Sequence, residues 1–161
     1  NNVKIILDKT PFYAESGGQV ADSGTISNEE CKLEISDVQK EDGFFIHFGK
    51  LKKGEIIDKP YSAEIDFDRR KNIARSHTAT HLLHKALKEV LGEHVQQKGS
   101  LVNGEHLRFD FTQYRQVSKR ELDMIEKIVN RKVRECLPVK VEIKKLAEAK
   151  KEGATALFGE K

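Results

Sequence analysis

A helical pattern of about two dozen residues, beginning near Asp68 and ending near Leu91, constrains the fold of this chain more than any other feature. Asp68 is placed to cap the helix and Gly92 to end it. At about 100° per residue the apolar side chains gather on one side, and three histidines form a narrow stripe on the other. The apolar residues are Ala79, Leu82, Leu83, Ala86, Leu87 and Val90, and the histidines are His77, His81 and His84. We therefore expect a long helix that packs by its apolar side and leaves the imidazoles free.

His77 and His81 are four residues apart, so their side chains lie one above the other on a helix. Two neutral imidazoles in this arrangement can bind Zn²⁺ at about 2.0–2.1 Å per nitrogen, but a tetrahedral site needs more than two ligands. From the spacing alone, an ordinary solvated helix surface is the somewhat better interpretation. A zinc protease would need Glu beside the first histidine, where this chain has Thr78, so we reject that class. His84 is expected at the surface or behind the metal ligands.

The 161 residues are enough for one ordinary domain or two small ones. The sequence has no apolar run of transmembrane length and no leader pattern, so we expect a cytoplasmic chain without a membrane partner. Cys31 and Cys136 are isolated thiols that indicate neither a disulfide framework nor a cysteine metal motif.

The two halves of the chain carry opposite net charge. Residues 1–68 hold 8 Lys and Arg against 14 Asp and Glu, a net −6, whereas residues 69–161 hold 21 against 12, a net +9. Basic residues gather on the histidine helix, among them Arg69, Arg70 and Arg75. This polarity favours RNA or another polyanion as a partner of the second half, although a solvated, salt-screened helix surface is a common alternative.

Residues 1–67 are predicted to form a β-rich unit. The short strands are Val3–Leu7, Cys31–Val38, Phe44–Phe48 and Tyr61–Ile65, with a Gly-rich turn region after the first. Turn signals at Asp42-Gly43, Lys53-Gly54 and Pro60 space the strands closely, and we expect a small barrel rather than a sandwich.

Residues 68–161 are predicted to form an α+β unit, in which two helices lie over an antiparallel sheet. Period-two alternation on both sides of Asn103-Gly104 indicates a hairpin after the histidine helix. Ser118 and Glu121 form a capping box ahead of a second amphipathic helix, which Pro138 ends. The expected sequel is a strand in which Val139, Val141 and Ile143 alternate with charged residues, and a short helix at Leu146–Lys151.

Several stretches, in this order and spacing, resemble one family. Asp8-Lys-Thr-Pro-Phe-Tyr-Ala-Glu-Ser-Gly-Gly-Gln19, followed by Asp22-Ser-Gly24, is similar to the Gly-rich motif that opens the editing domain of alanyl-tRNA synthetase and of free-standing alanyl-tRNA editing proteins. His77-Thr-Ala-Thr-His-Leu-Leu-His84 resembles their metal motif. His94-Val-Gln-Gln-Lys-Gly-Ser-Leu-Val-Asn103 with Leu107–Phe111 resembles their pocket strand and hairpin, and Gly153–Glu160 also fits. The resemblance covers nearly the whole chain, with Ala21 and Ser76 as small departures.

The resemblance implies a hydrolase that removes serine or glycine wrongly esterified to the alanine tRNA. Its zinc ion is held by an H-x-x-x-H pair, matched here by His77 and His81, and by a later C-x-x-x-H pair. The later pair has no match, because the fourth residue after Cys136 is Lys140. The chain starts at Asn1 rather than Met, and we expect the rest of a longer parent synthetase to supply this pair and the aminoacylation site. Zinc is therefore expected to bind weakly, or not at all, to this chain alone.

By the same resemblance the substrate pocket includes Thr80, Gln97, Thr78 and Gln19. Thr80 lies about 70° from the histidine stripe and is the leading candidate to bind the serine hydroxyl. A site that hydrogen-bonds this hydroxyl can reject alanine by about 10⁴-fold or more. Without the resemblance, Thr80 would be a helix hydroxyl bonded to its own backbone and Gln97 an exposed strand residue. Whether zinc activates water or only orders the pocket stays open.

The acceptor end of tRNA(Ala) is the partner that the resemblance implies. Gly17 and Gly18 most simply form a tight turn, and a contact with the terminal nucleotide is implied by the resemblance alone. Arg69, Arg70 and Arg75 are the candidate phosphate-binding residues. Two alternatives stay open: a fragment of a free-standing alanyl-tRNA editing protein, and a metal-free tRNA-binding module whose histidines contact only phosphate. The editing domain of threonyl-tRNA synthetase lacks the Gly-rich opening, so residues 8–24 argue against it.

Overall fold

The computed structural model describes residues 1–153, which form an α+β fold with antiparallel sheets. The α+β class is therefore confirmed. Residues 154–160, which carry most of the last stretch of the resemblance, lie outside the described range. Within that range, no helix has the length and the apolar character that crossing a bilayer requires.

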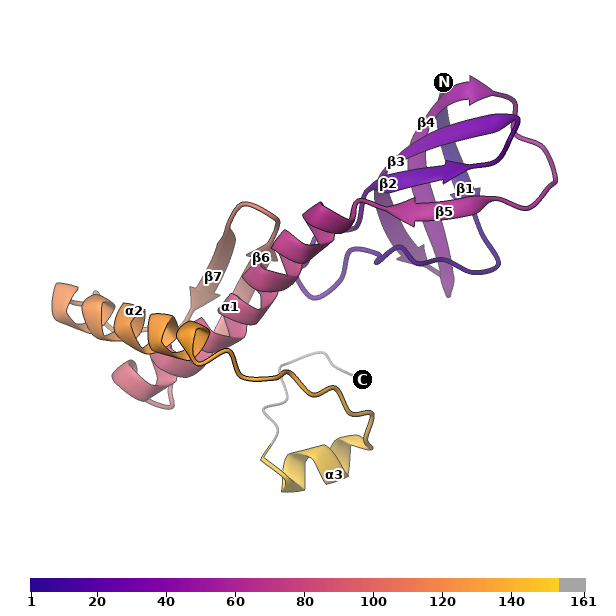
Figure 1. The fold of residues 1–161 in the computed structure, drawn as a ribbon. Coiled ribbons are helices and arrows are strands. Elements are labelled where there is room, and N and C mark those ends of the chain that lie inside the picture. The colour runs from indigo at the N-terminus through magenta and orange to yellow at the C-terminus, as the bar shows by residue number, and fades with distance from the viewer. Residues whose placement is uncertain (154–161) are drawn as a thin grey trace.

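Five antiparallel strands form the first sheet, in the order β1-β4-β3-β2-β5 (Figure 1). Alternate residues of β3 are buried, as in a strand with one face on a core. This core also contains Phe12 and Ala14 of the Gly-rich segment. The strands are β1 (Asn2–Ile6), β2 (Gly24–Ser27), β3 (Cys31–Glu41), β4 (Phe44–Gly54) and β5 (Ser62–Ile65).

The expected closed barrel is wrong. The edge strands β1 and β5 are short, at five and four residues, and the ladders of the described residues do not join them. A pocket of about 560 Å³ lies between these edges, lined by Ile5 of β1, Ala63 of β5 and the connection that includes Pro60. Both edges pack on the same core, so the sheet curves, but it stays open.

Helix α1 (Phe67–Leu91) contains 25 residues and runs away from the five-stranded sheet (Figure 1). Its N-cap is Asp66 and not Asp68, because the Asp66 carboxylate accepts the Arg69 N–H at 3.0 Å. Gly92 ends the helix with φ at +115°, as expected. The predicted domain boundary, after residue 67, therefore falls at the first turn of α1 and stays a prediction.

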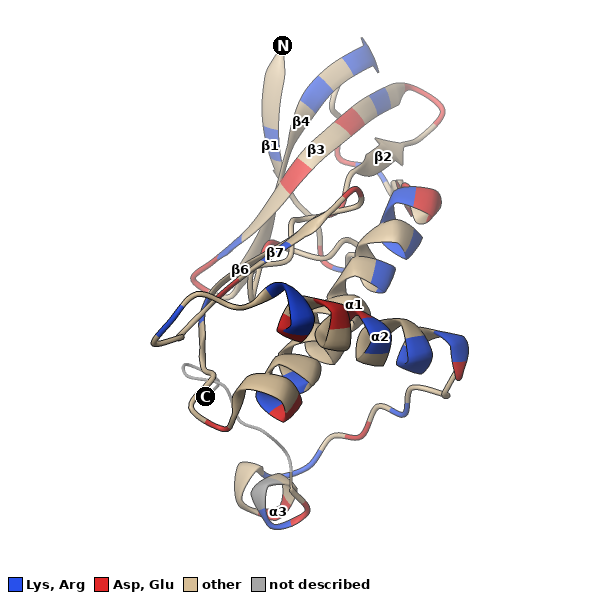
Figure 2. Cartoon of the chain, turned by 90° about the vertical axis from the view of Figure 1, so that its left-hand side faces the viewer, with Lys and Arg blue, Asp and Glu red and all other residues tan. Residues whose placement is uncertain are grey.

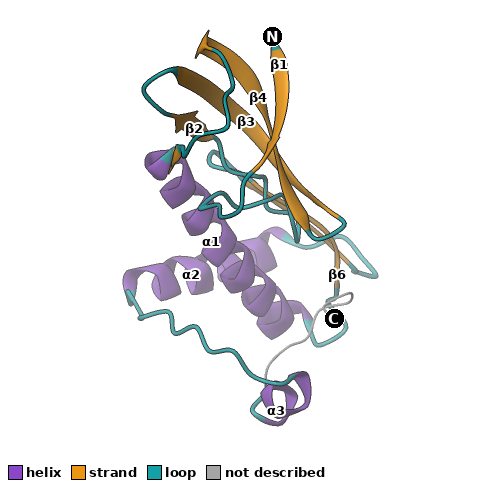
Figure 3. Ribbon diagram, turned by 90° about the vertical axis from the view of Figure 1, so that its right-hand side faces the viewer, coloured by secondary structure: helices purple, strands orange, loops and turns teal. Residues whose placement is uncertain are grey.

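The second layer consists of a hairpin and a helix that pack on α1 (Figure 3). Strands β6 (Gln97–Val102) and β7 (Leu107–Phe111) pair on either side of the Asn103-Gly104 turn. Helix α2 (Lys119–Arg134) begins with the expected capping box of Ser118 and Glu121. The second core is separate from the first and contains Ala86, Leu87, Val95 and Ile125, with Phe109, Phe111 and Val129 against it.

The strand expected around Val139–Ile143 is wrong. This segment is not paired with any described strand, and Val139, Val141 and Ile143 are 77%, 89% and 101% exposed. An alternating pattern gives a strand only where a ladder partner is present. The short helix that follows, α3 (Leu146–Lys151), has the predicted bounds.

Candidate functional site

The Gly-rich segment contains a tight turn at Gly17 and Gly18. Ser16 and Gln19 exchange backbone hydrogen bonds of 3.2 and 2.9 Å across Gly17 and Gly18. The two glycines have φ of +60° and +83°, and positive φ at both central positions is typical of a type I′ turn. The tight-turn interpretation of this pair is confirmed.

The turn docks on β6. The Val102 N–H donates to the Gly18 carbonyl at 2.7 Å, and the Val20 N–H donates to the Val102 carbonyl at 3.1 Å. A Cβ atom on Gly18 would stand 2.5 Å from the Ser100 carbonyl oxygen, so this approach requires glycine. Gln19, between the two hydrogen bonds, is 7% exposed.

The Gln19 side chain reaches the histidine helix. Its Oε1 lies 2.6 Å from His77 Nδ1, which joins residues 58 positions apart. The imidazole of His77 stacks on that of His81, with ring centroids 5.1 Å apart and planes at 13°. Burial, and then the neighbouring His81, lower the pKa of His77, so its imidazole is neutral near pH 7. A neutral, oriented imidazole can bind a metal ion or accept a proton.

Of the two places expected for His84, the surface and a position behind the metal ligands, the structure excludes the surface. Its side chain is 8% exposed and packs on Phe109, with ring centroids 5.1 Å apart. Burial is the main cause that lowers the pKa of His84. Its Nε2 has no hydrogen-bond partner among the described residues. His77 therefore faces the Gly-rich turn and His84 faces the hairpin, whereas His81 is exposed.

The three remaining pocket candidates lie in different places. Thr80 is buried, and its hydroxyl donates to the Ser76 carbonyl at 2.8 Å. This is the local backbone hydrogen bond expected for Thr80 without the family resemblance. Gln97 is half-buried opposite Phe111, at the far end of β6 from Val102. At about 3.3 Å per residue, Gln97 is roughly 17 Å along the strand from Val102, whose backbone is bonded to the turn. Among the hydrogen bonds of the described side chains, Gln19 contacts His77 and Gln97 does not.

Thr78 and Arg75 lie on a different side of α1 from the histidine pair. Both line an apolar groove of about 630 Å³, which α1 forms with the C-terminal end of α2 and the segment after it. The guanidinium of Arg75 donates to the Asn72 side chain at 2.9 Å. These two residues are therefore separated from the contact between Gln19 and His77.

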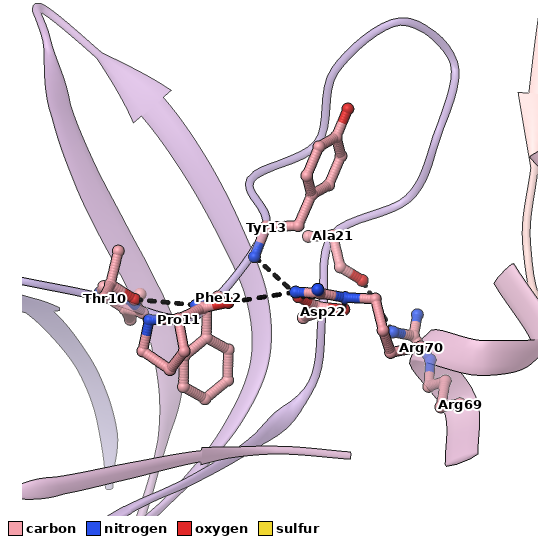
Figure 4. A network of polar contacts seen from close by, with 9 residues as sticks. Thr10, Pro11, Phe12, Tyr13, Ala21, Asp22, Arg69 and Arg70 are labelled. Carbon is pink, nitrogen blue, oxygen red and sulfur yellow. Dashed lines mark hydrogen bonds and ion pairs between the residues drawn. The ribbon is translucent and has the colours of Figure 1, made fainter. Parts of the chain in front are cut away.

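Arg69 and Arg70 bind the Gly-rich segment instead of projecting freely (Figure 4). Arg69 donates to the Ala21 carbonyl at 2.7 Å. The guanidinium of Arg70 forms a two-pronged ion pair with Asp22, which is 1% exposed, and donates to the Pro11 carbonyl at 3.1 Å. The sequence pattern does not mark Asp22 as a site residue, although it begins the Asp22-Ser-Gly24 part of the motif.

The described residues include two side chains that could serve as metal ligands. His77 and His81 supply two stacked imidazoles, and Gln19 holds Nδ1 of His77, which leaves Nε2 available as a ligand atom. Among residues 1–153, no group of three or more His, Cys, Asp and Glu side chains is arranged to hold a metal ion. The donor set fits half of a tetrahedral zinc site.

Residues 1–70 match the family model described as tRNA synthetases class II (A). The whole chain is similar in sequence to a segment of alanine--tRNA ligases. It is 53% identical over 167 residues to the alanine--tRNA ligase of Bacillus pumilus (strain SAFR-032), covering 100% of this chain and 19% of the relative. The enzymes of Thermoanaerobacter sp. (strain X514) and Bacillus subtilis (strain 168) are 53% and 51% identical, over 100% and 99% of this chain. The chain spans 18% of the length of each of these two.

Proposed function

We propose that this chain is a segment of a cytoplasmic alanine--tRNA ligase that carries an editing site. The reaction is hydrolysis of the ester that joins serine or glycine to tRNA(Ala). The observation that carries the proposal is the stacked pair of His77 and His81, with His77 held by Gln19 of the Gly-rich turn. The similarity to alanine--tRNA ligases along the whole chain supports the same proposal.

His77 and His81 are proposed as two of four zinc ligands, with the other two supplied by a different segment of the parent ligase. Bound zinc would polarise the ester carbonyl and lower the pKa of a bound water. The imidazoles suit this role because they are four residues apart on one helix, and because burial lowers the pKa of His77. A ligand must be deprotonated, and a lowered pKa keeps His77 so.

The ester needs little activation, so positioning of the substrate dominates the rate. Thr80 is the residue that we propose for recognition of the serine hydroxyl. Its own proton is bonded to the Ser76 carbonyl, and the hydroxyl oxygen can still accept a hydrogen bond. When alanine enters, this buried oxygen gains no partner, which disfavours the correct product relative to serine.

The partner is proposed to be the acceptor end of tRNA(Ala). The basic charge of the second half supports this, although Figure 2 shows that Lys and Arg are interspersed with Asp and Glu along α1 and α2. On α2, Lys119 pairs with Asp123 and Lys132 with Glu135, at 2.9 and 2.8 Å. Pairing of this kind reduces the charge that these helices offer to phosphate.

The test is deacylation of Ser-tRNA(Ala) by the full-length parent ligase, compared with its His77→Ala, His81→Ala double variant. We expect the variant to lose at least about 100-fold in rate, because it lacks half of the proposed ligands. His106→Ala is the matched control, since His106 is exposed in the hairpin turn and outside the site. Equal deacylation rates in the parent ligase, the double variant and the control would refute the enzyme hypothesis. Unchanged tRNA binding with no deacylation by any of them would favour a metal-free RNA-binding module.

A further inference from the structure

The imidazole of His77 is held in one tautomer. The atom that faces Nδ1 is the amide oxygen of Gln19, which can only accept a hydrogen bond, at 2.6 Å. Nδ1 must therefore carry the proton and donate it. The lone pair of the ring then lies on Nε2, the nitrogen that points away from Gln19.

Gln19 itself has little freedom to move. Its backbone is joined to Ser16 in the turn and bridged to Val102 of β6, and its side chain is buried. A side chain that is ordered before ligand binding loses less entropy when it orients a partner. The acceptor oxygen is therefore fixed relative to β6 rather than to α1, which carries the imidazole.

The stacked ring of His81 also restricts the orientation of the His77 ring. The planes of His77 and His81 are within 13° of parallel, so a rotation of the His77 ring would break both the stack and the hydrogen bond. Acceptors that bind the second nitrogen of a metal-ligating histidine fix its tautomer and its ring orientation. Gln19 has the position and the chemistry of such an acceptor.

We propose that Gln19 is a positioning residue for His77: through its amide oxygen, the Gly-rich turn selects the Nδ1–H tautomer and directs the Nε2 lone pair to the metal or substrate side. The direction of the lone pair toward a metal rests on the proposed function, whereas the tautomer does not. Gln19 thus acts through His77 and need not touch the water or the ester.

The first test is nitrogen NMR of the histidine rings in the 161-residue chain without metal, at a pH where His77 is neutral. We expect the His77 ring to carry its proton on Nδ1. In Gln19→Met, which retains the length of the side chain but has no acceptor oxygen, the Nε2–H tautomer should appear. Gln19→Glu retains an acceptor and should keep the Nδ1–H form. An Nε2–H ring in the unsubstituted chain overturns the proposal, even if Gln19→Met fails to fold.

The second test is Zn²⁺ affinity of the full-length ligase, measured by competition with a chelator. Loss of a partner of this kind typically weakens metal binding by about 10–100-fold, and we expect that loss for Gln19→Met but only a few-fold change for Gln19→Glu. Gln96→Met, at an exposed position just before β6, is the control. An unchanged affinity of Gln19→Met together with an unchanged His77 tautomer refutes the positioning role. Failure of deacylation with the expected tautomer refutes only the proposed function.

Discussion

The carboxylate of Asp22 is buried against the guanidinium of Arg70, 48 residues further along the chain. Its Oδ1 accepts from Arg70 Nε at 2.8 Å, and its Oδ2 accepts from the Tyr13 N–H at 2.7 Å. The hydrogen bond from Arg70 to Asp22 also raises the pKa of that guanidinium. This ion pair connects the Gly-rich segment to the first turns of α1, close to the Asp66 cap.

Asp22→Asn should therefore destabilise the chain by about 3 kcal/mol, because removal of one partner leaves the other without compensation. We take the lower end of the usual range since the Arg70 side chain is 32% exposed and can be partly hydrated. The measurement is urea unfolding at neutral pH. Asp123→Asn, in the exposed pair with Lys119, is the control and should lose at most about 1 kcal/mol. Equal losses in the two variants would contradict a structural role for the buried pair.

Alanine substitutions at the two glycines of the turn should differ. At Gly17 an added Cβ has open space within 4 Å, so Gly17→Ala bears only the cost of the left-handed backbone, about 1–2 kcal/mol. At Gly18 the same atom meets the Ser100 carbonyl oxygen at 2.5 Å, and the turn must move off β6. Gly18→Ala should lose clearly more stability in urea unfolding and should also change the His77 ring signals. Similar behaviour of both variants would show that the turn does not dock as described.

Acid should destabilise the fold through His47. This residue is fully buried, its Nδ1–H donates to the Ile5 carbonyl at 3.0 Å, and its Nε2 accepts from the Thr10 hydroxyl at 2.7 Å. Burial lowers the pKa of His47 below its ordinary value of 6.5. As the pH falls below about 6.5, the unfolded chain binds a proton that the folded chain does not bind, and the free energy of unfolding falls.

His47→Gln should flatten this dependence between about pH 6.5 and 5, by about 1.4 kcal/mol for each unit of the pKa difference that is removed. The checks are urea unfolding curves at several pH values. His106→Gln, at an exposed histidine, should leave the slope unchanged. His77 and His84 also have lowered pKa values, so a smaller slope of the same sign should remain in the His47 variant.

Zinc should bind weakly to the 161-residue chain, because the described residues offer only the two imidazoles of His77 and His81. Calorimetric titration with Zn²⁺ should give an affinity far below that of the parent ligase, and His77→Ala should abolish it. Stoichiometric zinc that survives a chelator in this chain would contradict the prediction.

Thr80→Val should reduce the preference of the parent ligase for Ser-tRNA(Ala) over Ala-tRNA(Ala). Loss of one hydrogen bond is worth about 1 kcal/mol or more, so the ratio of the two deacylation rates should fall at least several-fold. Thr78→Val removes the same hydroxyl from the groove side of α1 and should leave the ratio unchanged. A fall in the ratio for Thr78→Val alone would assign the recognition to the other side of the helix.

Features of the fold that depend on neighbours in the sequence were predicted well. The capping box of Ser118 and Glu121, the hairpin at Asn103-Gly104 and the end of α1 at Gly92 each depend on hydrogen bonds or backbone angles within a few residues. The barrel and the strand at Val139–Ile143 depend on pairing between distant segments, which the alternation of side chains does not specify. The barrel and this strand were predicted wrongly. Among the local features, the N-cap of α1 was also predicted wrongly, at Asp68 instead of Asp66.

In the candidate site too, contacts between residues close in the sequence were predicted, and contacts between distant residues were not. The spacing of His77 and His81 predicted their proximity, because a helix places every fourth residue on one side. The contact of Gln19 with His77 and the pair of Asp22 with Arg70 join residues 58 and 48 positions apart. A periodic pattern contains no information on such contacts, and the arginines that we assigned to tRNA are bonded within the chain.

Gln19 belongs to the segment that follows β1, and its turn is bonded to β6. The position of its side chain against His77 therefore depends on how the first half of the chain packs on the second. A slip of one residue along β6 amounts to about 3.3 Å, which is longer than the hydrogen bond itself. The NMR signals of the His77 ring should therefore report whether the Gly-rich turn is docked on β6. A substitution in the five-stranded sheet that moves this turn should change those signals, although it does not contact α1.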